Sequence, residues 1–198
     1  NPAGFATRKD LSIGISYGNR FILKELSNKD AGILLPINIG TIGISFSQFG
    51  YEHYNENLFG LGLSRSFGQN LRIGLKLYYM SIRFSEEYEN RSVPTFDLGI
   101  QYQINKSLCL GAYIFNPINV RIGSLNKDKV PIIMRIGFAY HIVDEFMICG
   151  EIEENFDDDF SFRFGLEYEV YKNVFVRSGF QLMPCLFTFG IGYDYKRF

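Results

Sequence analysis

The sequence contains no tryptophan, only six prolines and only three cysteines among its 198 residues. It also has no apolar run near the roughly 18 residues that a membrane-spanning helix requires, so no helical transmembrane segment is expected. The net charge of −1 gives no excess of positive charge, and no nucleic-acid partner is therefore predicted. Cys109, Cys149 and Cys185 are odd in number and widely spaced, which fits neither a disulfide framework nor a zinc site. We interpret them as small apolar packing residues, and we expect no cofactor.

Aromatic residues and glycine are abundant instead, with 20 Phe, 13 Tyr and 20 Gly. This mixture favours strands and tight turns over helices. The stretch "LRIGLKLYY" (71–79) places apolar residues at every second position, and Arg72, Gly74 and Lys76 fall between them. The same alternation recurs at 132–142, 160–170 and 187–196. A period of two predicts strands with one apolar face.

Segmenting the chain by this period predicts about twelve strands. Most have the roughly 9–11 residues that a tilted strand needs to cross a bilayer. Their connections alternate between tight polar turns, such as "GQN" at 68–70, and longer stretches, such as "SEEYENRS". This alternation is typical of outer-membrane barrels, in which the short turns are periplasmic. The expected strands are 10–18, 30–38, 40–49, 55–67, 70–84, 93–104, 107–117, 130–142, 145–156, 159–170, 173–182 and 185–196.

The polar phase of these strands is dense in glycine, with Gly60, Gly62, Gly74 and Gly99 among many. A strand face in water usually carries Thr, Lys and Glu, whereas small residues suit a crowded concave interior and ease the curvature of a closing sheet. We therefore predict an all-β fold, a transmembrane antiparallel up-and-down β-barrel whose apolar face contacts outer-membrane lipid. The expected location is the outer membrane of a Gram-negative bacterium. A soluble all-β domain, with its apolar face inward, is the alternative.

The opening "NPAGFA" (1–6) resembles the "NPAG" box of the FadL/PorV superfamily of outer-membrane barrels. The phrases "TFDLGIQY" (95–102), "NPINV" (116–120), "MRIGFAY" (134–140) and "FTFGIGYDYK" (187–196) follow in the family's order. The resemblance covers nearly the whole chain and implies a barrel of about 14 strands. It therefore implies that residues 1–198 are a single barrel domain that lacks segments at both ends. A complete twelve-stranded barrel that ends at Phe198 is the rival interpretation.

Charged residues of both signs fall on the polar phase of the predicted strands, and we expect them to face the lumen. The signs are nearly balanced, which favours cross-strand ion pairs that brace the barrel wall. Solute selectivity is a second possibility. Acid–base chemistry by a pair such as Glu151 and Glu153 is a third, although we predict no enzyme. The residues are Arg72, Lys76, Asp97, Arg135, Glu151, Glu153, Arg163, Glu167, Arg177 and Asp194.

The resemblance implies a non-enzymatic partner or scaffold subunit of a larger outer-membrane complex for protein secretion. The longer loops have about a dozen residues or fewer, which we interpret as too short to fold into the lumen as a constriction. They are the expected partner-contact sites, at 20–30, 86–92 and 121–129. The alternative is a FadL-like transporter that takes up a hydrophobic ligand. The contact residues expected are Phe21, Ile22, Leu23, Glu86, Tyr88, Arg121 and Lys127.

Overall fold

The computed structural model describes residues 1–19, 23–84, 90–122, 128–156 and 160–195. These residues form one antiparallel sheet of twelve strands, in which each strand pairs with the next long strand in the sequence. The strands of this sheet are β1 (Ser12–Asn19), β2 (Ser27–Ile37), β3 (Gly40–Gly50), β4 (Tyr54–Phe67), β5 (Leu71–Phe84), β6 (Arg91–Gln103), β7 (Leu108–Phe115), β10 (Ile133–Val143), β11 (Phe146–Asn155), β12 (Ser161–Tyr171), β13 (Val174–Leu182) and β14 (Leu186–Tyr193).

The twelve strands predicted from the alternation are confirmed, and their ends lie within three residues of the predicted ones. The all-β, antiparallel, up-and-down architecture is therefore confirmed as well. Four short elements were not predicted because they carry no repeating pattern. They are the 3-10 helices η1 (Pro2–Thr7) and η2 (Lys24–Leu26), and the two-residue strands β8 (Arg121–Ile122) and β9 (Asp128–Lys129), which pair with each other.

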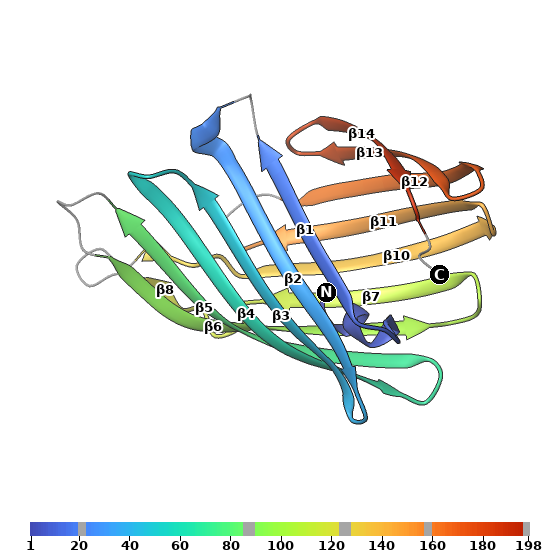
Figure 1. Ribbon diagram of the computed structural model, residues 1–198, viewed down its shortest axis with the longest axis horizontal. Coiled ribbons are helices and arrows are strands. Elements are labelled where there is room, and N and C mark those ends of the chain that lie inside the picture. Colours follow the sequence, from blue (N-terminus) through green and yellow to red (C-terminus); the bar gives the residue numbers. More distant parts are fainter. Residues whose placement is uncertain (20–22, 85–89, 123–127, 157–159, 196–198) are drawn as a thin grey trace.

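The sheet is strongly curled, so that β1 to β4 cross in front of β7, β10 and β11 (Figure 1). Within the described residues, β1 and β14 are the two edge strands and do not pair with each other. The two run antiparallel and have eight residues each. The curl gives the sheet a concave side, and η1 lies on it (Figure 1).

The polarity of the sheet is the reverse of that in a soluble protein. Apolar side chains on the convex phase are open to the surroundings, with Leu77 54% and Ile136 63% exposed, whereas Asp97 on the concave phase is only 2% exposed. An apolar convex face with polar residues inside is the arrangement of a transmembrane barrel. We call the concave polar side the lumen face. Among the described residues, no helix has the length and hydropathy to cross a bilayer.

The two ends of the sheet differ in their connections. Turns of two to four residues join β2 to β3, β4 to β5, β6 to β7, β10 to β11 and β12 to β13 at one end of the sheet. The opposite end carries the longer connections, the longest of which joins β7 to β10 through residues 116–132. It also carries two connections of three residues, from β3 to β4 and from β13 to β14, so the predicted alternation of short turns and longer loops holds only in part.

The described residues at the two ends of the connection after β7 fold toward the lumen face. Asn116 is fully buried. Its amide nitrogen donates to the Val130 carbonyl at 2.7 Å, and its Oδ1 accepts from the Thr95 hydroxyl at 2.9 Å and the Val120 N–H at 3.1 Å. Thr95 lies on the lumen phase of β6, next but one to Asp97. One asparagine thus ties both ends of this loop inward, and our expectation that the longer loops are too short to form a constriction stays a prediction.

Replacing Asn116 by alanine is expected to destabilise the protein by roughly 2–4 kcal/mol, because three hydrogen-bonding groups, two of them buried, lose their partner. Asn119→Ala is the matched control. Asn119 has the same left-handed backbone (φ 52° against 53°) and is exposed to solvent. Urea unfolding of the two variants in detergent or lipid measures the difference. Equal destabilisation of both would mean that the backbone conformation, and not the hydrogen bonds, makes Asn116 important.

Candidate functional site: the lumen face

The main charged group on the lumen face is a cluster that joins three adjacent strands. Arg163 donates from Nη1 to Glu151 Oε1 at 2.8 Å and to Glu153 Oε2 at 2.7 Å. It also donates from Nη2 to Glu153 Oε1 at 2.8 Å. Arg135 donates from Nε to Glu153 and lies 3.7 Å from Glu151. We call these four residues the arginine–glutamate cluster.

Strand register explains why these charges meet. Arg135 of β10 lies opposite Glu153 of β11, and Glu151 of β11 lies opposite Arg163 of β12. The alternation of β11 brings Glu151 and Glu153 to the same face, so each arginine reaches both carboxylates. A second pair, Arg177 with Glu167, forms between β12 and β13 at directly opposite positions. The predicted structural pairing is therefore present for these six residues.

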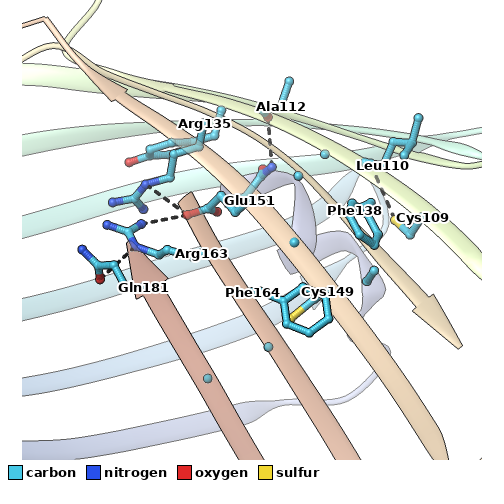
Figure 2. Close-up of a pocket in the computed structure, with 18 of the residues that line it drawn as sticks. Cys109, Leu110, Ala112, Arg135, Phe138, Cys149, Glu151, Arg163, Phe164 and Gln181 are labelled. Atoms are coloured by element: carbon cyan, nitrogen blue, oxygen red, sulfur yellow. Dashed lines mark hydrogen bonds and ion pairs between the residues drawn. The ribbon is translucent and has the colours of Figure 1, made fainter. Parts of the chain in front are cut away.

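A cavity of about 530 Å³ lies beside the arginine–glutamate cluster. Its lining comes from β6, β7 and β10 to β14, and Asn1 closes one side. Figure 2 shows Arg135, Glu151 and Arg163 converging at its edge, with Gln181 next to Arg163. These three charged side chains are 34–37% exposed, so they are in contact with solvent as well as with each other. Part of the cavity wall is thus charged and open to solvent.

The N-terminal helix η1 lies across the lumen face of β4, β5 and β6. Asn1 donates from Nδ2 to the carbonyl oxygens of Ile100 at 3.2 Å and Ala112 at 3.0 Å, and its Oδ1 accepts from the Ala3 N–H. The Ser64 hydroxyl donates to the Ala3 carbonyl at 3.0 Å. Asn1 therefore caps the helix and fastens it to β6 and β7, while Ser64 fastens it to β4.

A second charged group lies between η1 and the loop after β7. Asp97 accepts hydrogen bonds on Oδ2 from the hydroxyls of Tyr78 at 2.9 Å and Tyr113 at 3.1 Å. Lys76 is directly opposite Asp97 in the sheet, with its ammonium 4.7 Å from the centre of the Tyr78 ring. Within the described part of the chain, Asp97 Oδ1 has no hydrogen-bond partner. Two tyrosines thus hold this buried carboxylate against the barrel wall, and a lysine lies opposite it.

Arg72 and Asp194, two further predicted lumen charges, are more exposed to solvent than Asp97. Arg72 is half-buried on the lumen phase of β5, opposite Gln101. Asp194 follows β14 at the short-turn end and is exposed, and its backbone N–H donates to the Asn173 carbonyl at 2.9 Å. Neither residue belongs to the arginine–glutamate cluster.

Two of the predicted partner-contact residues fall within the described chain. Leu23 is 50% exposed before η2, and Arg121 is exposed in β8. Their role in partner binding stays a prediction. The other five, Phe21, Ile22, Glu86, Tyr88 and Lys127, lie outside the described residues.

Several lumen residues were not singled out from the sequence. Tyr78, Tyr113 and Gln181 share the polar phase of their strands with the predicted charges, so alternation alone could have included them. Asn1 and Asn116 lie outside regular strands, and no periodic signal identifies them. In the part of the chain that the structure describes, no group of His, Cys, Asp or Glu is arranged to hold a metal ion.

Comparisons with known proteins identify the fold. No protein-family model matches the chain, and no curated protein sequence matches it. Among solved structures, a KdgM porin is similar over 94% of this chain and 98% of its own, with a TM-score of 0.56 and 14% identity. A KdgM porin in complex with disordered oligogalacturonate covers 87% and 94%, with a TM-score of 0.55 and 13% identity. The NanC porin covers 93% and 99%, with a TM-score of 0.48 and 11% identity.

The fold is therefore that of a small outer-membrane porin. The predicted transmembrane β-barrel in the outer membrane of a Gram-negative bacterium is confirmed by this fold and by the exposed apolar face of the sheet. The soluble alternative is wrong, because it requires the apolar phase to be buried. The prediction that the chain is not an enzyme agrees with the porin fold, but fold likeness does not test activity and it stays a prediction.

The resemblance to the FadL/PorV superfamily is wrong, since the fold matches KdgM porins over nearly their whole length. The scaffold role in protein secretion and the FadL-like alternative rested on that resemblance and are withdrawn with it. Three of the quoted phrases are strand sequences, and alternation of this kind is a general property of barrel strands. The other two, "NPAGFA" and "NPINV", lie at η1 and in the loop after β7, and each is too short to identify a family. The prediction that the chain lacks terminal segments stays untested.

Replacing Glu153 by glutamine is expected to cost roughly 1–3 kcal/mol of stability, because both arginines of the cluster lose a charged acceptor. Glu153 is the most enclosed member of the cluster, with 14% of its side chain exposed. Glu145→Gln removes the same charge at an exposed turn and is the matched control. The unfolding midpoints of the two variants in urea test this. A Glu153→Gln midpoint equal to that of the control would show that the cluster contributes nothing to stability.

Proposed function

We propose that this chain is a porin-type channel that lets small polar solutes diffuse across the outer membrane with little preference for charge. The observation that carries the proposal is the water-accessible cavity beside the arginine–glutamate cluster, on the inner side of a sheet whose outer side is apolar. A lumen lined by polar and charged side chains is what an aqueous channel requires. The porin fold supports the same function by analogy.

The weak charge preference follows from the pairing of the lumen charges. Three guanidinium groups, those of Arg135, Arg163 and Arg177, are paired with three carboxylates, so these ion pairs carry no net charge. Rings or tracks of one sign are what give a pore strong ion selectivity. A balanced wall instead offers hydrogen-bond donors and acceptors to any polar solute that enters.

Sugars are suitable test solutes, because one similar porin is described in complex with an oligogalacturonate. That ligand is a polyanion, and a polyanion is best held by cations that have no internal partner. In this chain each arginine of the cluster already binds a glutamate. We therefore expect uncharged sugars to permeate at least as readily as acidic sugars of the same size.

The first test is a comparison of sugar uptake in liposome-swelling measurements with the purified protein. Similar rates for a neutral sugar and its acid support the proposal. Liposomes that hold verified, folded protein but do not swell would contradict the channel function itself. A strong preference for the acidic sugar would contradict the charge-neutral part of the proposal.

Neutralising the two glutamates of the arginine–glutamate cluster is expected to make the channel prefer anions. The double substitution Glu151→Gln and Glu153→Gln leaves the guanidiniums of Arg135 and Arg163 without acceptors. The anion-to-cation permeability ratio should then rise roughly fivefold, as about 1 kcal/mol of close-range interaction in water would give. Reversal potentials across planar bilayers in a salt gradient measure this ratio.

The reciprocal substitution, Arg135→Gln with Arg163→Gln, is expected to shift the permeability ratio toward cations. Glu145→Gln changes the charge at an exposed turn and should leave the ratio unchanged. If both double variants keep the wild-type reversal potential, permeating ions do not pass the arginine–glutamate cluster.

A further inference from the structure

We infer that the N-terminal helix η1 is a fixed constriction of the lumen that sets the size limit for solutes, and that a glycine seat on the barrel wall holds it in place. This inference rests on the proposed channel function and adds the element that determines which polar solutes pass. The glycine seat consists of Gly43, Gly74 and Gly99, all on the lumen phase of their strands.

The N-terminal segment borders two cavities inside the curl of the sheet. Asn1 lines the cavity of about 530 Å³ beside the arginine–glutamate cluster. Phe5 and Arg8 line a second cavity of about 620 Å³, whose walls come from β1, β2, β3 and Lys76 of β5. The segment from Asn1 to Arg8 therefore borders both cavities. A solute that occupies either cavity lies beside this segment.

The wall approaches η1 so closely that only glycine fits at the glycine seat. A Cβ atom at Gly74 would lie 2.4 Å from the Pro2 carbonyl carbon and 2.5 Å from the Ala3 nitrogen. Both are backbone atoms, which cannot rotate out of the way. A Cβ at Gly99 would lie 2.0 Å from Asn1 Oδ1, and one at Gly43 would lie 2.6 Å from the Phe5 ring. Glycine allows two backbones to approach this closely because it has no Cβ atom.

The contacts on η1 hold it firmly. Pro2 is fully buried, Ala3 is 0% exposed, and the Ala3 carbonyl accepts a hydrogen bond from Ser64, which is itself 1% exposed. The Phe5 ring packs against Gly43, and the Lys76 ammonium lies 5.8 Å from the ring centre. A segment with buried backbone, satisfied hydrogen bonds and apolar packing is part of the wall and does not open and close with each solute.

Gly74→Ala is the substitution that tests the inference, because its new methyl group meets the backbone of η1. Gly14→Ala is the matched control, since Gly14 is on the lumen phase of β1 and a Cβ there has no heavy atom within 4 Å. Displacing the 3-10 helix η1 removes an obstacle that is wound more tightly than an α-helix of about 10 Å diameter, so Gly74→Ala should raise the single-channel conductance about twofold or more. It should also admit larger neutral sugars in liposome swelling, while Gly14→Ala behaves as the wild type.

Hydrogen exchange of residues 1–9, measured by mass spectrometry on the same samples, reports whether η1 has left its seat. Faster exchange in Gly74→Ala together with a larger conductance supports the inference. Faster exchange with an unchanged size limit would overturn it, because η1 would then be displaced without widening the path. Unchanged exchange and conductance would also overturn it, because the glycine seat would not be what holds η1.

Phe5→Ala is a second variant that leaves the barrel wall untouched and serves if Gly74→Ala does not fold. Loss of the ring between Gly43 and Lys76 should raise the conductance by less than the displacement of the whole helix does. A conductance equal to the wild type would argue against the constriction. If neither the wild type nor any variant conducts, the proposed channel function fails, and hydrogen exchange alone then decides whether the glycine seat holds η1.

Discussion

The structure depends on the pairing of backbone N–H and C=O groups between neighbouring strands, which leaves the side chains free to differ on the two faces of the sheet. Hydrocarbon offers no hydrogen-bond partners, so a chain that crosses a bilayer must satisfy its backbone internally. The twelve-stranded ladder does this from β1 to β14. The alternation of side chains then sends leucine, isoleucine and aromatic residues outward and collects charged and small residues inside.

The interior formed in this way is unevenly filled. The wall made by β4, β5 and β6 carries η1 and, toward the other end, the loop tied by Asn116, with Asp97 between them. The wall made by β10, β11 and β12 carries the arginine–glutamate cluster and borders open space. One side of the lumen is therefore covered by other parts of the chain, and the other is open. This asymmetry is the reason to place the solute path along the arginine–glutamate cluster.

Period-two alternation was sufficient to predict the twelve strands, because it is a local property repeated many times. The inverted polarity needed a second observation, the density of glycine on the polar phase. Alternation also identified Arg135, Glu153 and Arg163 as inward charges. It could not predict which charges meet, since that depends on register between strands. Alternation could not predict the positions of η1 and of the loop after β7, because neither segment is periodic. Gly74 and Pro2, for example, meet although they are 72 positions apart in the sequence. The family resemblance failed because most of its phrases reflect barrel strands in general, and the two that do not are only five or six residues long.

The most direct test of an aqueous lumen uses two native cysteines. Cys109 and Cys149 line the cavity beside the arginine–glutamate cluster, whereas Cys185 is exposed in the turn between β13 and β14. The measurement is the single-channel current of the Cys185→Ser protein in a planar bilayer, before and after a charged, membrane-impermeant thiol reagent is added. The account predicts that both remaining cysteines react and that the current falls. Cysteines that react without any change in current, or that react only after unfolding, would contradict it.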